Sequence, residues 1–143
     1  KKSISEIFSN EGEDSFRKIE NQVLQEIAKH HSLIVATGGG VVTRKENWGV
    51  LHQGIVIWLN TERNRLITRL KEDSVKRPLL NADDFVDSFD KIYEKRKRLY
   101  EESDLEIPIN DESPKEVSEK IIDLLPGILT DPEVSNGPQT IEV

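Results

Sequence analysis

Three consecutive glycines, Gly38, Gly39 and Gly40, follow an apolar run at residues 33–37. Glycine lets a backbone approach another group closely, but it loses more conformational entropy on folding than any other residue. The triplet therefore indicates either the floor of a ligand site or a tight turn from a strand to a helix, and the glycines alone favour neither. They lack the G-x-G-x-x-G spacing and the G-K-[ST] ending of nucleotide-binding loops.

Three arginines are candidates for binding an anion. Arg96 lies on the same helical stripe as several apolar residues, so its guanidinium is expected to point inward. A buried guanidinium needs a carboxylate partner, from the protein or from a ligand. The alternative is that the long side chain of Arg96, which lies in a run of basic residues, extends to solvent. Arg17 lies at the margin of an apolar helix face, where an ion pair with Glu20 is the simpler explanation taken alone. Arg77 precedes Pro78 in a polar loop, which is typical of a lid over phosphates or of an ordinary solvated connection.

Alternating helices and strands must position these residues. Helical periodicity, N-capping signals and continuous apolar runs indicate where each element lies. In chain order, the expected elements are helices at about 3–8 and 13–30, a strand at 33–37, a helix at 45–52, a strand at 55–59, a helix after Thr61, a helix at 84–102, a strand at 105–109 and a helix from Pro114. This alternation predicts an α/β fold with a parallel sheet, in which ligands bind beyond the carboxyl ends of strands.

Composition narrows the class of protein. The 143 residues suffice for one domain, which we expect to span residues 1–125, while residues 126–143 show no sustained period and are expected to be a disordered tail. The net charge of -7 disfavours a nucleic-acid partner, and no apolar run approaches the length that spans a membrane. With no cysteine, disulfides and thiolate metal sites are excluded. Because methionine is absent even at position 1, we expect a processed chain or a fragment.

Five segments resemble the shikimate kinase family in their order and spacing: EGEDSFRKIE, ATGGGVV, KRPLL, YEKRKRLYEESD and ESPKEV. The resemblance extends from about Ser3 to Leu125. These enzymes are small P-loop phosphotransferases that move the γ-phosphate of ATP to the 3-hydroxyl of shikimate, on the route to chorismate and the aromatic amino acids. The resemblance implies a P-loop kinase-like parallel sheet with flanking helices, ATP and Mg²⁺ as cofactors, shikimate as the partner, and a monomer in the cytoplasm, or in a plastid if the source is a plant.

The resemblance assigns the acceptor site to residues on both sides of the glycines. Arg17 and Arg96 match the arginines that hold the shikimate carboxylate. Gly39 matches the glycine whose backbone contacts the substrate, with Gly38 and Gly40 beside it. Glu20 matches a residue that orients Arg17 and does not touch substrate.

The resemblance assigns the ATP site to a different set of residues. Arg77 matches the lid arginine that reaches the phosphates of ATP, and it is the candidate catalytic residue. Pro114 matches a proline that packs on adenine, and Arg69 is the candidate for the arginine on the other face of the base. No metal ligand is assigned in this chain.

The family's first strand, its G-x-x-x-x-G-K-[ST] loop and a second strand bearing an aspartate have no counterpart here. That loop would supply the amides and lysine for the β- and γ-phosphates and the hydroxyl for Mg²⁺. Because the family's first strand is central in its sheet, we expect this chain alone to have a gap between strands, low stability and no activity. Two alternatives stay open: a non-catalytic, kinase-like binding module, and another small-metabolite P-loop kinase such as gluconate kinase.

Overall fold

A pair of parallel strands forms the sheet of the computed structural model, which describes residues 2–72, 80 and 84–129. Strand β1 spans Ile57–Thr61 and strand β2 spans Leu105–Ile109, and the register pairs Ile57 with Leu105 and Thr61 with Ile109. Helices connect the two strands along the chain, as a parallel pair requires. The predicted strand at 105–109 is confirmed, and the one predicted at 55–59 begins and ends two residues later.

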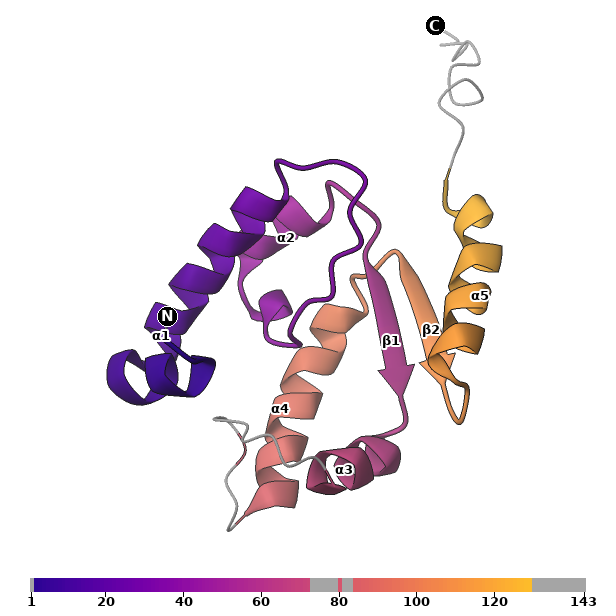
Figure 1. Ribbon diagram of the computed structural model, residues 1–143. Coiled ribbons are helices and arrows are strands. Elements are labelled where there is room, and N and C mark those ends of the chain that lie inside the picture. Colours follow the sequence, from indigo (N-terminus) through magenta and orange to yellow (C-terminus); the bar gives the residue numbers. More distant parts are fainter. Residues whose placement is uncertain (1, 73–79, 81–83, 130–143) are drawn as a thin grey trace, which may run out of the picture.

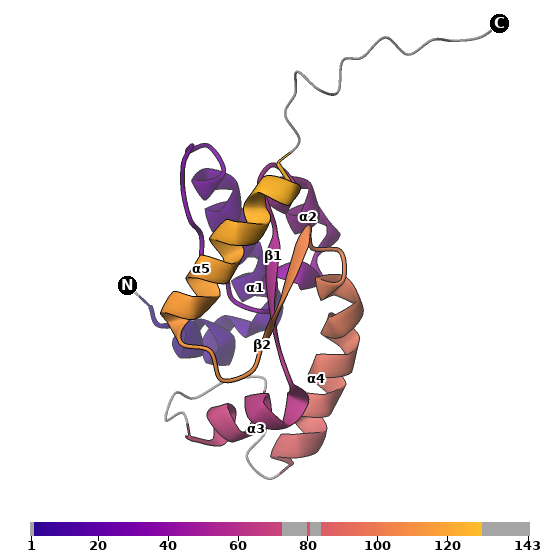
Figure 2. The ribbon, with the colours of Figure 1, turned by 90° about the vertical axis from the view of Figure 1, so that its right-hand side faces the viewer.

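Helices surround this sheet on both sides (Figure 1). Within the described residues they are α1 Ile4–Ile27, α2 Lys45–Leu51, α3 Arg63–Glu72, α4 Phe85–Tyr100 and α5 Pro114–Leu124, with 3₁₀ turns η1 Val41–Thr43 and η2 Leu125–Gly127. Helix α5 lies over β1 and β2 (Figure 2), where Val117 packs against the buried Ile107 and Ile109. A second apolar cluster joins α1, η1 and α2 through Leu24, Val42 and Trp48.

The N-termini of α1 and α5 carry the two capping boxes that the sequence predicts. The Ser3 hydroxyl accepts from the amide of Glu6 at 3.2 Å, and the Glu6 carboxylate accepts from the amide of Ser3 at 2.6 Å. Ser113 and Glu116 make the same reciprocal pair at 3.3 and 2.7 Å, with Pro114 in the first turn. Hydrogen bonds from Ser3 and Ser113 lower the pKa values of Glu6 and Glu116. Both helices therefore begin where local side chains satisfy their first amides.

Helix α1 bends sharply at Gly12, where two separate helices were expected. Gly12 has φ of 81° and ψ of 171°, so both predicted helices form within one element that changes direction at this residue. Positive φ at this position favours glycine. The rings of Phe8 and Phe16 lie 4.7 Å apart across the bend and hold its two sides together. The second half ends at Ile27, three residues before the expected end at 30.

The predicted strand at residues 33–37 is wrong, because these residues form no strand in the structure. Ile34 is fully exposed, and the side chains of Leu33 and Val35 are about half exposed. A cavity of about 410 Å³ separates this segment from residues 53–57, which lead into β1. A strand exists only through hydrogen bonds to a neighbouring strand, and residues 33–37 make no backbone hydrogen bond to another described segment. An apolar run therefore does not become a strand without a partner.

Some expectations fall outside the described residues. Arg77 and most of the polar connection between α3 and α4 belong to this group, as do residues 130–143 of the expected tail. Pro126 and Gly127, at the start of that tail, lie in η2. None of the helices that the described residues form has the length and apolarity that crossing a bilayer requires.

Candidate functional site

The Arg17 side chain is buried on α1 between two carboxylates. Its Nη1 donates to Glu20 Oε2 at 2.7 Å, and its Nε and Nη2 donate to Glu13 Oε1 at 3.2 and 3.1 Å. The guanidinium also lies 5.2 Å from the ring centroid of Phe16. Arg17 retains only 6% of its accessible surface, so these partners offset the desolvation of a buried cation. The ion pair with Glu20 that helical spacing predicts is present.

Gly40 lies directly against this guanidinium. A Cβ added at Gly40 would collide with the Nη1, Nη2 and Cζ atoms of Arg17. The φ angle of Gly40 is -89°, which any residue adopts, so the position needs glycine for space and not for its backbone conformation. The close approach that the glycine triplet indicates is therefore an approach of Arg17 to Gly40.

Gly39 faces two side chains of α4. The Tyr100 hydroxyl donates to the Gly39 carbonyl oxygen at 2.6 Å. A Cβ added at Gly39 would lie 2.7 Å from this hydroxyl oxygen and 3.7 Å from Nη1 of Arg96. A Cβ at Gly38 would meet only Glu20, at 4.0 Å, so Gly38 has ordinary room for a side chain. The structure thus brings Arg17 and Arg96 to adjacent glycines from two different helices.

Tyr100 is buried next to both guanidinium groups, and each of them affects its pKa. Burial raises the pKa of the Tyr100 phenol above its ordinary value, whereas the nearby positive charges of Arg96 and Arg17 oppose this shift. Arg96 itself is half-buried. Tyr100 is not among the residues predicted from the sequence. Its position four residues after Arg96, on the same face of a helix, is the signal that could have identified it.

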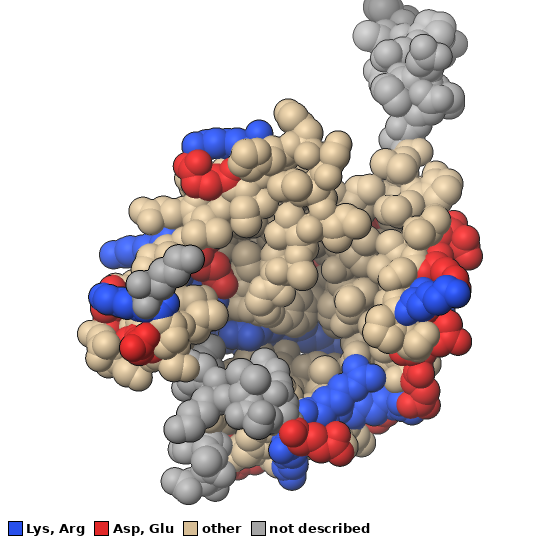
Figure 3. Space-filling model, viewed as in Figure 1, with Lys and Arg blue, Asp and Glu red and all other residues tan. Residues whose placement is uncertain are grey.

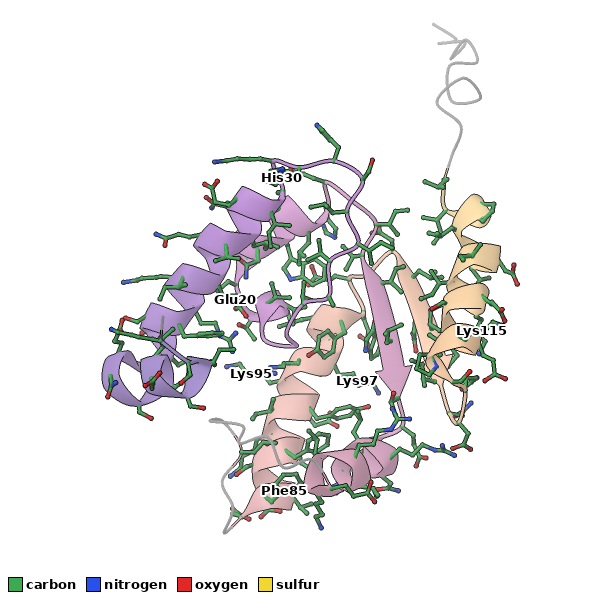
Figure 4. The ribbon with its side chains drawn as sticks, viewed as in Figure 1. Glu20, His30, Phe85, Lys95, Lys97 and Lys115 are labelled. Carbon is green, nitrogen blue, oxygen red and sulfur yellow. The ribbon has the colours of Figure 1, made fainter. Side chains whose placement is uncertain are left out.

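Figure 3 shows a hollow near the centre of one face of the molecule, with basic side chains at its lower border. In Figure 4, Glu20 lies on α1, and Lys95 and Lys97 lie on opposite sides of α4. Arg96, between these two lysines in sequence, faces Gly39. The site therefore combines helix side chains with the backbone of the glycine segment.

A second group of predicted residues lies beyond the carboxyl ends of β1 and β2. Arg65 of α3 donates to both carboxylate oxygens of Asp111, one of these bonds being 2.9 Å, and thereby ties α3 to the loop before α5. This hydrogen bonding lowers the pKa of Asp111, and the charge of Arg69 adds to the effect. Arg69 and Pro114 are exposed, in the last turn of α3 and the first turn of α5. The structure thus places both near the same loop.

Metal binding has no candidate cluster among the residues that the structure describes. No group of three or more His, Cys, Asp or Glu side chains is arranged to hold a metal ion in that part of the chain. The carboxylates nearest the candidate site, Glu13 and Glu20, already accept hydrogen bonds from Arg17. Glu13 and Glu20 therefore do not fit a Mg²⁺ site.

Comparison with solved structures defines the class of protein. A structure of shikimate kinase from Acinetobacter baumannii in complex with shikimate matches with a TM-score of 0.80 and 32% identity, over 87% of this chain and 70% of that chain. The shikimate kinase of Aquifex aeolicus matches with a TM-score of 0.73 and 29% identity, over 87% of this chain and 73% of that chain. The protein therefore has the α/β fold of the P-loop kinases.

Sequence comparison defines the family within that class. The shikimate kinase family model matches residues 1–126. The shikimate kinase of Prochlorococcus marinus (strain NATL2A) is 51% identical over 143 residues, which make up 100% of this chain and 72% of that protein. That of Synechococcus sp. (strain CC9902) is 52% identical over 130 residues, or 91% of this chain and 68% of that protein. The chain belongs to the shikimate kinase family.

Proposed function

We propose that the protein containing this chain is an ATP-dependent shikimate kinase, which transfers the γ-phosphate of ATP to the 3-hydroxyl of shikimate in aromatic amino acid biosynthesis. Membership of the family supports this activity. The structural observation that carries it is the convergence of Arg17 and Arg96 on Gly39 and Gly40. Two guanidinium groups at one site suit an acceptor that carries a carboxylate, because they bind it through charge-assisted hydrogen bonds.

Arg17 has donors for such an acceptor. A guanidinium carries five N–H groups, of which three donate to Glu13 and Glu20. We assign the two N–H groups that these carboxylates do not engage to the shikimate carboxylate. Glu20 then orients Arg17, as the resemblance implies, and the pairing lets the guanidinium stay buried in the absence of substrate.

The ATP side of the site is assigned to Arg77, Arg69 and Pro114. Phosphoryl transfer depends mainly on positioning and on stabilising the charge of the transferred group, so a cation that reaches the phosphates is the catalytic candidate. We propose this role for Arg77, which lies outside the described residues. Mg²⁺ would accompany ATP and neutralise phosphate charge when bound. We also propose a cytoplasmic monomer.

A coupled assay for ADP release tests the function. With MgATP we expect turnover of shikimate by the protein that contains this chain, and no turnover of gluconate. Activity on gluconate alone would identify another metabolite kinase. Shikimate binding by calorimetry without any turnover would indicate a non-catalytic binding module. Sequencing the coding region upstream of Lys1 separates shikimate kinase from the non-catalytic module, because an open reading frame that encodes G-x-x-x-x-G-K-[ST] favours the kinase.

A further inference from the structure

We propose that Tyr100 is a positioning residue of the acceptor site, where its hydroxyl holds the Gly39 carbonyl and the Arg96 guanidinium in the arrangement that receives the acceptor carboxylate. The inference rests on the proposed function.

The first contact fixes the backbone. The Tyr100 hydroxyl donates to the Gly39 carbonyl oxygen at 2.6 Å, across 61 residues of sequence. A peptide unit is planar, so holding this carbonyl also sets the direction of the Gly40 amide on the opposite side of the same plane. Tyr100 thus orients the glycine backbone that the resemblance places against the substrate.

The second contact fixes a cation. The Tyr100 hydroxyl oxygen and Arg96 Nη1 lie on the same side of Gly39, 2.7 and 3.7 Å from where its Cβ would be. A phenol has one donor and two acceptor lone pairs, so the hydroxyl that donates to Gly39 has a lone pair for the Arg96 guanidinium. Burial raises the pKa of the phenol, which keeps its proton in place for the bond to Gly39. Arg96 is therefore held beside Gly39 by a group that competes weakly with an anionic ligand, in contrast to the two carboxylates that hold Arg17.

The ring is anchored independently of the hydroxyl. It stacks on Trp58 of β1 with centroids 5.7 Å apart, and it packs against the apolar cluster of Leu24, Val42 and Trp48. Removal of the hydroxyl alone should therefore leave the fold intact. The sheet, through Trp58, sets where the hydroxyl lies relative to the glycines.

The test is Tyr100→Phe in the protein that contains this chain, assayed with shikimate and MgATP. Loss of one hydrogen bond to the site should raise KM for shikimate about tenfold while kcat and KM for ATP change by less than about twofold. The matched control is Tyr93→Phe, which removes a hydroxyl from the same helix where the ring stacks on Phe89, 5.6 Å between centroids. This control should leave all three constants unchanged.

A double-mutant cycle adds a readout that a purely structural role would not move. Gly39→Ala places a Cβ 2.7 Å from the Tyr100 hydroxyl oxygen but 3.9 Å from its ring carbon Cζ. The alanine should therefore raise KM for shikimate less in the Tyr100→Phe background than in the wild type. Additive effects of the two substitutions would contradict the proposed contact.

Two failures are distinguishable. If the wild type turns over shikimate and Tyr100→Phe retains its KM, the inference is wrong and the proposed function stands. If the wild type neither binds nor phosphorylates shikimate, the proposed function fails and the inference fails with it. The amide chemical shift of Gly40 provides a measurement without activity, since loss of the bond to the Gly39 carbonyl should move it in Tyr100→Phe and not in Tyr93→Phe.

Discussion

The guanidinium of Arg17 lies so close to Gly40 that no side chain fits between them. Because Glu13 and Glu20 hold the guanidinium, it cannot swing aside without breaking ion pairs. We expect Gly40→Ala to lower the free energy of unfolding by about 1–3 kcal/mol, the usual effect of overpacking, and to raise KM for shikimate. Urea denaturation and steady-state kinetics measure the two effects.

The matched control for Gly40→Ala is Gly49→Ala. Gly49 lies in α2, and a Cβ there would meet nothing within 4 Å. Alanine should raise the free energy of unfolding by about 0.5–1 kcal/mol, because glycine is unfavourable in a helix. If Gly40→Ala behaved like Gly49→Ala, the close packing of Arg17 on Gly40 would be disproved.

Glu20→Gln should weaken the hold on Arg17 more than Glu13→Gln does. The Glu20 side chain is 16% exposed, whereas that of Glu13 is 46% exposed, so water compensates the loss of Glu13 more readily. We expect Glu20→Gln to lower the free energy of unfolding by about 1–3 kcal/mol, as for a buried charge that loses one of its partners. Chemical denaturation measures the free energy of unfolding of both variants. Equal losses in Glu20→Gln and Glu13→Gln would contradict the prediction.

Arg77 and Arg96 should affect different substrates. If Arg77 reaches the phosphates of ATP, Arg77→Ala lowers turnover, on the order of 10³-fold by analogy with other phosphoryl-transfer enzymes, or raises KM for ATP while shikimate binding is retained. Arg96→Ala should weaken shikimate binding and leave ATP binding nearly unchanged. Equilibrium titration with each ligand separates the two roles. An Arg77→Ala variant with impaired shikimate binding and normal ATP binding would assign its loop to the acceptor.

Ile107 of β2 is the most buried apolar side chain of the sheet. None of its surface is exposed, and it belongs to the apolar cluster that includes Ile57 of β1 and Val117 of α5. We expect Ile107→Ala to lower the free energy of unfolding by about 2–5 kcal/mol, through lost burial and the cavity it leaves. The control is Ile122→Ala on α5, where the side chain is 64% exposed and the expected change is within about 0.5 kcal/mol. Thermal and urea unfolding of the two variants measure the difference.

The ionisation of Glu112 should make the free energy of unfolding depend on pH below 4.5. The hydrogen bond from Lys120 and the one from the Asn110 amide lower the pKa of Glu112 from 4.5 to about 2. The ionised Glu112 carboxylate therefore stabilises the folded state fully above pH 4.5, and this stabilisation is lost as the pH falls toward 2. NMR titration of the carboxyl carbon checks the value. Lys120→Ala should move the pKa upward, and an unchanged value would show that the lysine is not its cause.

Local signals in the sequence determined much of the helical framework. Ser3 with Glu6, and Ser113 with Glu116, place two helix starts correctly, because a capping box satisfies the first amides with residues only three positions away. The ordered motifs also indicated the family, which the comparisons confirm. The helical stripe placed Arg96 on an inward face of α4, as the structure shows.

Contacts between distant segments were decided only by the tertiary structure. The run at 33–37 reads as a strand from its composition, but strand formation depends on a paired neighbour, and a cavity separates the run from the residues before β1. The three consecutive glycines indicated that another group approaches their backbone closely, but they did not identify that group. That Arg17 occupies the space at Gly40, and that Tyr100 bonds to the Gly39 carbonyl, follows from how α1 and α4 pack around this segment, which no local pattern encodes.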